Sequence, residues 1–438
     1  NTLGKIYLVN RVRENFKFVC SPDQKYAVKR IDDRDQSRAL GKGIDVEEPV
    51  VAYHTKTNLL SSFLELSYAP DPSEKAAHNA APIGMLCSLA VGIVSFIVSK
   101  DLFSALTAFA AAACICVPMA CVLAINVPIR RLCKRALRMG AMLIGYPAVQ
   151  HFGDTTALVL DAEELFPAGS VVLHGMKTFG GQRVDDVILD AAAVICKAGG
   201  PLAGVFEQII KGRHEMLPKV DSIVYEDELG FIAWVGGKRT LIGTRRLLEE
   251  HGIAPPSRDY EAKYQKGARQ LTYLATGGEL VAMFVVSYLP DEKIAPELQR
   301  LEDNGVCFLV RTADSNITPR LVADAYSLFY RNIKILPHAQ AAFYGEARLR
   351  PEERTRAYLA TRGERLPALA RMLSACIRLR GSLSLAVVLQ VIGVVIGFLL
   401  VAFLTFYAGL PQLGALELML YLAFWVLAAL VVPSLRRP

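Results

Sequence analysis

The chain has 438 residues, of which 53% are hydrophobic and 21% are charged, and its formal net charge is +7. Its mean hydropathy of +0.31 excludes an ordinary soluble enzyme and, with so many charges, indicates separate membrane and aqueous segments. We expect no nucleic-acid partner, because basic residues gather beside apolar runs, where they favour retention of those ends in the cytosol. Examples are Arg130, Arg131, Lys134, Arg135, Arg138, Arg378, Arg380, Arg436 and Arg437.

Residues 1–80 precede the first apolar run. Alternating apolar and polar stretches, such as residues 17–20 and 49–53, predict a small and mostly β unit, and the polar residues 70–79 lead from it to the membrane. The chain begins at Asn1 rather than Met and has no signal peptide. We therefore expect a fragment or a trimmed form of a longer protein.

Four apolar runs predict four transmembrane helices, at residues 83–98, 102–129, 383–407 and 416–433. Each is long enough, or nearly so, to cross about 30 Å of hydrocarbon. Only Ser99, Lys100 and Asp101 separate the first two, which predicts a tight hairpin. An even number of spans places both termini on one side, and the basic flanks predict that this side is the cytosol.

The second aqueous segment, residues 140–381, alternates between strand and helix patterns. Strands are predicted at residues 157–160, 280–287 and 306–310, and helices at 184–196, 240–253 and 294–304. Strand, helix and strand in this order predict an α/β domain with a parallel sheet.

Several residues in this arrangement resemble those of a P-type ATPase, in particular its heavy-metal-transporting branch. Leu158-Val-Leu-Asp161 resembles the strand that ends in the family's Asp-Lys-Thr-Gly-Thr, and Thr312-Ala313-Asp314 follows an apolar strand like the family's Thr-Gly-Asp. Pro118 lies 43 residues before Asp161 (161 − 118), a spacing similar to that between the family's membrane Cys-Pro-Cys and its phosphorylated aspartate. The likeness covers residues 49–433 in order.

Gly236, Gly237 and Gly243 resemble the glycine-containing segment of the family's nucleotide domain. The resemblance implies a haloacid-dehalogenase-like P domain with an inserted nucleotide domain, four transmembrane helices and a partial β actuator-like domain. The implied segments are 1–80 (actuator-like), 81–130 (transmembrane hairpin), 131–180 (first phosphorylation-like part), 181–275 (nucleotide-domain-like), 276–381 (second phosphorylation-like part) and 382–438 (transmembrane hairpin). It also implies catalytic roles for Asp161, Thr312 and Asp314, nucleotide binding at the three glycines, and Mg²⁺ and ATP as cofactors of an active form.

Met119 and Cys116 lie beside Pro118 and have side chains that bind soft ions such as Cu(I). The family's flanking cysteines are Val117 and Met119 here, and Cys121 lies five positions from Cys116, on a different helix face. A proline kink packed by small residues is the alternative interpretation.

Most of the family's catalytic groups are replaced. Ala162-Glu163-Glu164 follows Asp161 where the family has Lys-Thr-Gly, so carboxylates stand where an incoming phosphate needs positive charge and hydrogen-bond donors. No lysine follows Lys334 and no aspartate follows Asp324, so the family's later lysine and its magnesium-binding aspartate have no counterpart. The family's His-Pro pair appears as Gly200-Pro201, and residues 1–80 contain no Thr-Gly-Glu.

We therefore expect an integral membrane pseudo-ATPase, in a bacterial plasma membrane with cytosolic soluble domains, that acts by binding or regulation. Its expected partners are the lipid bilayer, with a partner membrane protein and a nucleotide as further options. An active ATP-driven cation transporter with altered motifs and a decaying remnant without activity are the alternatives. Asp161 could also simply cap a turn, and Asp161-Ala162-Glu163 also resembles the Asp-x-Asp of haloacid-dehalogenase phosphatases.

Overall fold

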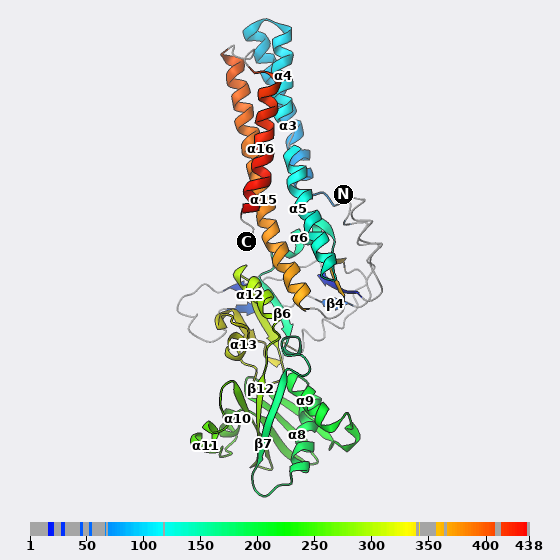
Figure 1. Cartoon of the computed structure of the whole chain (residues 1–438), viewed down its shortest axis with the longest axis vertical. Coiled ribbons are helices and arrows are strands. Elements are labelled where there is room, and N and C mark those ends of the chain that lie inside the picture. Colours follow the sequence, from blue (N-terminus) through cyan, green and yellow to red (C-terminus); the bar gives the residue numbers. More distant parts are fainter. Residues whose placement is uncertain are drawn as a thin grey trace. The chain divides into compact units, whose positions relative to one another are not determined.

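The computed structural model describes residues 16–21, 28–30, 44–46, 52–54, 66, 69–116, 119–338, 341, 356–362, 366–407 and 413–435. The chain divides into two compact units, and Figure 1 labels some of their elements. We call one the membrane unit (Asn1–Ser21, Tyr53–Thr155 and Glu353–Pro438) and the other the aqueous unit (Pro22–Ala52 and Thr156–Glu352).

The membrane unit is built around five apolar or amphipathic helices. They are α3 (Pro72–Ser99), α4 (Leu102–Cys116), α5 (Met119–Arg138), α15 (Leu366–Phe406) and α16 (Ala415–Leu435). Among the described residues, α3, α15 and α16 are long and apolar enough to cross a membrane, and α4 is a shorter apolar helix. The expected second span, residues 102–129, is thus divided between α4 and α5, and a count of four spans stays a prediction.

Local sequence sets the ends of the first hairpin. Asp71 accepts a hydrogen bond from the Glu74 N–H at 2.8 Å, and the Glu74 carboxylate accepts one from the Asp71 N–H at 3.0 Å, so together they cap the start of α3. At the other end, Lys100 adopts a left-handed conformation (φ 54°). Asp101 then accepts from the Ser104 N–H at 2.9 Å, which caps α4 and confirms the tight connection.

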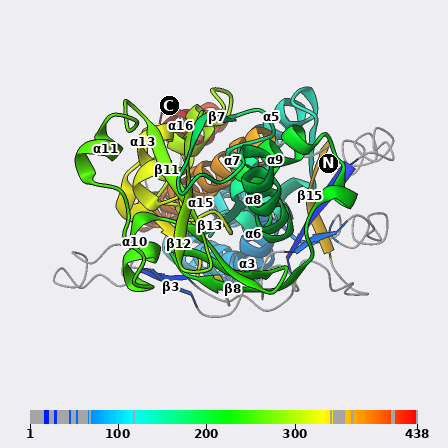
Figure 2. The same cartoon turned by 90° about the horizontal axis from the view of Figure 1, so that it is seen from below.

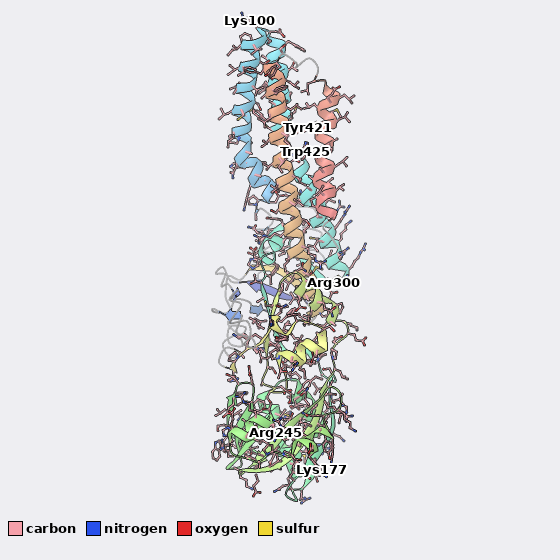
Figure 3. The ribbon with its side chains drawn as sticks, turned by 90° about the vertical axis from the view of Figure 1, so that its left-hand side faces the viewer. Lys100, Lys177, Arg245, Arg300, Tyr421 and Trp425 are labelled. Atoms are coloured by element: carbon pink, nitrogen blue, oxygen red, sulfur yellow. The ribbon has the colours of Figure 1, made fainter. Side chains whose placement is uncertain are left out.

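Small side chains let these helices approach closely. Ala124 of α5, Ala386 of α15 and Ala429 of α16 form one buried cluster. A Cβ atom on Gly393 of α15 would lie 2.6 Å from the ring of Trp425, which is labelled on α16 in Figure 3. Small residues at helix contacts are characteristic of membrane bundles, whose lipid-facing sides carry large apolar groups. Such exposed groups occur here on α3, α15 and α16.

A four-stranded sheet completes the membrane unit, in the order β4-β1-β15-β5. Its strands are β1 (Phe16–Ser21), β4 (Ala52–His54), β5 (Ala141–Leu143) and β15 (Arg356–Arg362). Strand β15 pairs antiparallel with β1 and β5, so segments from both ends of the chain meet in one sheet. Helix α6 (Gly145–Phe152) follows β5. The other residues expected in an actuator-like domain lie mostly outside the described ranges.

The aqueous unit contains a parallel sheet in the order β14-β13-β6. Its strands are β6 (Ala157–Asp161), β13 (Cys307–Arg311) and β14 (Ile333–Ile335). Helices α7 (Ala162–Leu165), α12 (Ala295–Asp303) and α13 (Pro319–Tyr326) flank these strands in sequence. The prediction of strands at 157–160 and 306–310, with a helix at 294–304, is confirmed. A short 3₁₀ turn, η3 (Tyr330–Asn332), precedes β14, and a separate hairpin pairs β2 (Val28–Arg30) with β3 (Ile44–Val46).

The largest sheet is antiparallel, in the order β7-β12-β11-β10-β9-β8. Its strands are β7 (Val171–Thr178), β8 (Val220–Glu226), β9 (Gly230–Val235), β10 (Lys238–Gly243), β11 (Arg269–Thr276) and β12 (Glu279–Tyr288). The predicted helix at 240–253 is therefore wrong in its first part. Residues 238–243 pair with β9 through the two-residue turn at Gly236 and Gly237, and the helix α10 spans only Arg245–Glu250.

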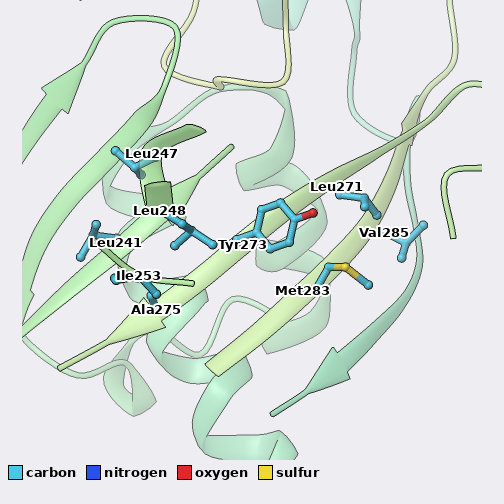
Figure 4. Close-up of a cluster of buried hydrophobic side chains, with 9 residues drawn as sticks. All are labelled: Leu241, Leu247, Leu248, Ile253, Leu271, Tyr273, Ala275, Met283 and Val285. Carbon is cyan, nitrogen blue, oxygen red and sulfur yellow. The ribbon is translucent and has the colours of Figure 1, made fainter. Parts of the chain in front are cut away.

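Alternating side chains of this sheet pack against helices on opposite faces. Met283 and Val285 join Leu247 and Leu248 of α10 in the apolar cluster of Figure 4. Phe284, between them, contacts Phe206 of α9 (Pro201–Ile210) at a ring distance of 5.5 Å. Helix α8 (Val184–Ala198) packs beside α9, as Figure 2 shows. Two short helical turns, η2 (His214–Met216) and α11 (Arg258–Ala262), complete the described elements of this unit.

Candidate functional site

Asp161 and Arg311 end neighbouring parallel strands and face each other. They are direct register partners of β6 and β13, and carboxyl ends of parallel strands are where ligand crevices form in such sheets. The Arg311 Nε donates to Asp161 Oδ1 at 2.5 Å, with side-chain exposures of 25% and 17%. The expected nucleophile is thus engaged by a cation of the chain itself.

Asp161 also occupies the N-cap position of α7. The Glu164 carboxylate accepts a hydrogen bond from the Asp161 N–H at 3.3 Å, and the cap residue has extended backbone angles (φ −77°, ψ 139°). This geometry supports the structural interpretation of Asp161 as the residue that starts a short helix.

Asp314 lies three residues after β13 and is almost fully buried, with 4% of its surface exposed. Tyr288 Oη donates to its Oδ2, and the Asn316 N–H donates to its Oδ1 at 3.0 Å. Burial raises the pKa of Asp314 to about 6, against the lowering effect of these hydrogen bonds, and Glu163 raises that pKa further through charge repulsion.

Thr312, the third expected catalytic residue, forms a hydrogen bond with the nearby backbone. Its Oγ1 accepts a hydrogen bond from the Asp314 N–H at 2.9 Å, which fixes the turn between Thr312 and Asp314. The turn is therefore held by a side chain of the same motif, while the Asp314 carboxylate points into protein rather than solvent.

A buried polar network links this turn to the antiparallel sheet. Asn316 Nδ2 donates to Thr272 Oγ1 at 2.5 Å and lies 3.3 Å from Tyr288 Oη. Thr272, Tyr288, Asn316 and Asp314 are all nearly inaccessible to solvent. Satisfied buried networks rigidify their surroundings, because breaking one leaves an orphaned polar group.

Two further contacts involve residues that follow the parallel strands β13 and β14. Gly200 has φ +94°, and a Cβ atom there would lie 3.6 Å from both the Cβ and the N of Asp314. The His338 N–H donates to Asp227 Oδ1 at 2.7 Å, and the His338 ring stacks on Tyr225 at 3.6 Å. His338 follows Leu336-Pro337, where the family's later lysine is expected, and there it contacts the β8–β9 turn.

The three glycines expected to bind nucleotide lie in the hairpin of β9 and β10. Gly236 and Gly237 form the connecting turn, with φ of +54° and +76°, and a methyl group at either position would meet open space. Gly243 instead lies opposite Gly230 in the strand pair, where a Cβ atom would overlap the Leu229 carbonyl oxygen. Backbone geometry thus explains why glycine occupies these three positions. A role in nucleotide binding stays a prediction.

The expected soft-metal residues lie at the junction of α4 and α5. Cys116 ends α4, and its Sγ accepts from Ser88 Oγ at 3.8 Å, next to Gly84. Met119 begins α5, but its side chain, like Val117, Pro118 and the Cys121 side chain, lies outside the described set. Within that set, no group of three His, Cys, Asp or Glu side chains is placed to hold a metal ion.

Sequence reasoning missed Arg311, Tyr288, Asn316 and Thr272. The available signal was Arg311 itself, a charged residue that directly follows four buried strand residues and precedes Thr312. The other three could not be found, because their polar groups meet only through long-range pairing.

The chain is similar to curated heavy-metal pumps. It is 24% identical over 310 residues to a copper-exporting P-type ATPase of Bacillus subtilis, covering 68% of this chain and 38% of that protein. It is 22% identical over 287 residues to a copper-transporting P-type ATPase of Rhizobium leguminosarum bv. viciae, covering 63% and 34%. It is 23% identical over 278 residues to a zinc-exporting P-type ATPase of Mycobacterium marinum, covering 60% and 37%.

The chain thus spans little more than a third of the length of these relatives. No protein-family model matches it. A crystal structure of a zinc-transporting PIB-type ATPase aligns with 91% of this chain and 70% of its own, at 15% identity and a TM-score of 0.43. The sequence homologues of the chain are heavy-metal P-type ATPases, which export or transport copper or zinc.

Proposed function

We propose that this chain is a P-type-ATPase-like membrane protein that has lost ATP hydrolysis and acts by binding or regulation. The observation that carries the proposal is the ion pair between Arg311 Nε and Asp161 Oδ1. A nucleophilic carboxylate must approach phosphorus with a free oxygen, and here a guanidinium holds one of its two oxygens, Oδ1, at 2.5 Å, which lowers the nucleophilicity of the carboxylate.

The charges around Asp161 also disfavour phosphoryl transfer. Glu163 and Glu164 belong to the first turn after Asp161, where they repel the phosphate that must enter. Charge develops on the transferring group and has to be opposed by fixed positive groups, each typically worth about 10²–10³ in rate. Several such groups are missing, although their losses need not multiply.

The donor set does not fit a catalytic magnesium ion. Mg²⁺ requires near-octahedral oxygen ligands at about 2.0–2.1 Å. One Asp161 oxygen is paired with Arg311, and both Asp314 oxygens accept hydrogen bonds from Tyr288 and Asn316. No step of the proposed function therefore depends on a metal held here.

The alternative is an active ATP-driven cation transporter with altered motifs. One observation favours it, namely that Asp161 and the Thr312–Asp314 turn stand at the ends of adjacent parallel strands. This alternative requires the Arg311 pair to open and a metal-binding carboxylate to come from elsewhere.

An assay of phosphate release by the purified full chain in lipid distinguishes the pseudo-ATPase from the active transporter. With ATP, Mg²⁺ and either Cu(I) or Zn²⁺, we expect wild type, Asp161→Asn and the exposed control Asp303→Asn to release phosphate at the same background rate. Turnover in wild type and Asp303→Asn that disappears in Asp161→Asn would establish the transporter instead.

Calorimetric titration of the full chain with ATP tests the binding role. A nucleotide-regulated pseudo-ATPase should give a saturable heat of ATP binding. The Asp161→Asn variant should give the same heat, because the Asp161 carboxylate pairs with Arg311 rather than with the nucleotide. Absence of any saturable heat would favour a role through another partner or the inactive-remnant alternative.

A further inference from the structure

The basic residues of α5 lie on one side of the helix. An α-helix has 3.6 residues per turn, so five of its side chains fall within a sector of about 140° around the helix axis. In order around the axis they are Arg130, Lys134, Arg138, Arg131 and Arg135. All five are exposed, whereas Ile129, Leu132, Cys133 and Ala136 on the opposite side are buried. The helix therefore presents a continuous cationic face, which we call the basic sector.

None of these five cations has a hydrogen-bonded or ionic partner in the part of the chain that the structure describes. Arginines elsewhere do have partners, as in the pairs Arg380–Asp154 and Arg300–Glu297. Helix α5 itself contains no acidic residue. Among the described residues, the basic sector is thus not neutralised by ionic partners.

Helix packing places the basic sector at the edge of the apolar bundle. Ala124, Ala386 and Ala429 pack at one level of the bundle. Six residues from this level, or about 9 Å toward the C-terminal ends of α5 and α16, lie Arg130 on α5 and Leu435 on α16. The same distance toward the N-terminal end of α15 leads to Arg380. Leu435 ends α16, whose 21 residues measure about 30 Å, the thickness of the hydrocarbon layer.

Arg130 thus lies near the hydrocarbon boundary, and the rest of the basic sector extends into the headgroup layer beyond it. Clusters of four or more Lys and Arg directly beside a transmembrane segment attract anionic headgroups, and long basic side chains reach toward that layer. Simple retention in the cytosol does not require all five to lie on one face.

We propose that the basic sector of α5 binds the phosphate groups of anionic phospholipids in the adjacent membrane leaflet. The partner is the bilayer itself, recognised by its negative headgroups, and five exposed cations on one helix face provide the complementary charge. The inference needs the membrane location of the helices but is independent of whether the crevice hydrolyses ATP.

Lipid selectivity of the full chain tests the proposal. The purified chain is reconstituted in vesicles of phosphatidylcholine that contain trace spin-labelled phosphatidylglycerol or phosphatidylcholine, and the motionally restricted fraction of each label is measured. We expect a preference for phosphatidylglycerol of about tenfold or more at low salt, since each basic residue near the surface contributes.

Replacing Arg130, Arg131, Lys134, Arg135 and Arg138 with Gln should abolish this preference. Replacing the four arginines with Lys should keep it. The matched control replaces five exposed cations of the aqueous unit with Gln, namely Lys211, Arg213, Lys263, Lys266 and Arg320, and should also keep it. A preference that survives loss of the basic sector, or falls equally in the control, overturns the proposal.

Two measurements on wild type keep the test decisive if the five-Gln variant does not fold. Raising the salt to about 1 M, where the screening length is about 3 Å, should remove the preference; a preference that persists is not electrostatic and overturns the proposal. Millimolar glycerol 3-phosphate should not displace the lipid, and displacement would indicate a site for a free phosphate compound instead.

Discussion

Arg311 is the counter-ion of Asp161. Its guanidinium reaches the Asp161 carboxylate from the neighbouring strand, so that the charge of this one carboxylate is balanced within the chain. Both side chains are partly buried, and such charge-assisted hydrogen bonds contribute more than exposed pairs do.

Arg311→Leu should lower the stability of the aqueous unit. The loss leaves the Asp161 carboxylate without its guanidinium, and we expect a cost of about 1–3 kcal/mol, visible as a lower thermal midpoint. The matched control is Arg246→Leu, whose pair with Glu250 is exposed (72% and 43%) and should matter little. Equal midpoints for the two variants would contradict a structural role of the Arg311 pair.

Asp314 is the second residue whose chemistry depends on burial. Its pKa is raised to about 6, so the folded chain holds the proton more tightly than the unfolded chain. The resulting stability is fully present below the ordinary carboxyl pKa of 3.8 and is lost as the pH rises through about 6.

Asp314→Asn should therefore change the pH dependence of unfolding. The variant loses one hydrogen bond at every pH, but it avoids the buried negative charge that wild type acquires. Relative to wild type, we expect its thermal midpoint to improve steadily between about pH 4 and pH 7. Asp303→Asn, which alters an exposed carboxylate, should show no such trend, and a flat difference for Asp314→Asn would contradict the buried position.

At the scale of single elements, β9 and β10 show how tertiary pairing overrides a helical pattern. Residues 240–253 have the apolar spacing of a helix, yet the first four belong to a strand, because the Gly236-Gly237 turn returns the chain along β9. Glycine is needed at Gly243 for a different reason, since the strand pair packs it directly against Gly230 and the Leu229 carbonyl.

Gly243→Ala and Gly237→Ala should differ in their cost. A methyl group at 243 would collide with backbone atoms of Leu229 and Gly230, and we expect a loss of several kcal/mol, of the kind that overpacking and strand displacement cause. A methyl at 237 meets open space and should cost about 1–2 kcal/mol for its positive φ. Thermal unfolding of both variants checks this order, and a reversed order would refute the packing described for Gly243.

The chain combines a unit that carries long apolar helices with a second compact unit. The α3–α4 connection at Lys100 and the first residue of α16, Ala415, lie at the end of the helices away from the basic sector. The positive charges of α5 favour the cytosol for the opposite end.

Cysteine labelling checks this topology in intact cells. With native cysteines replaced, a membrane-impermeant reagent added from outside should label cysteines placed at Lys100 and Gln412. A cysteine at Arg131 should react only after the membrane is permeabilised. Labelling of the Arg131 position in intact cells would reverse the predicted orientation.

The sequence by itself determined the apolar helices, the aqueous segments and the strands that end at Asp161 and before Thr312. These follow from side-chain periodicity and from caps such as Asp71 with Glu74, which act within a few residues. Tertiary structure alone decided that Arg311 neutralises Asp161, 150 positions away, and that Asn316 bonds Thr272, 44 positions away. Such contacts depend on strand register and burial, which no local pattern specifies.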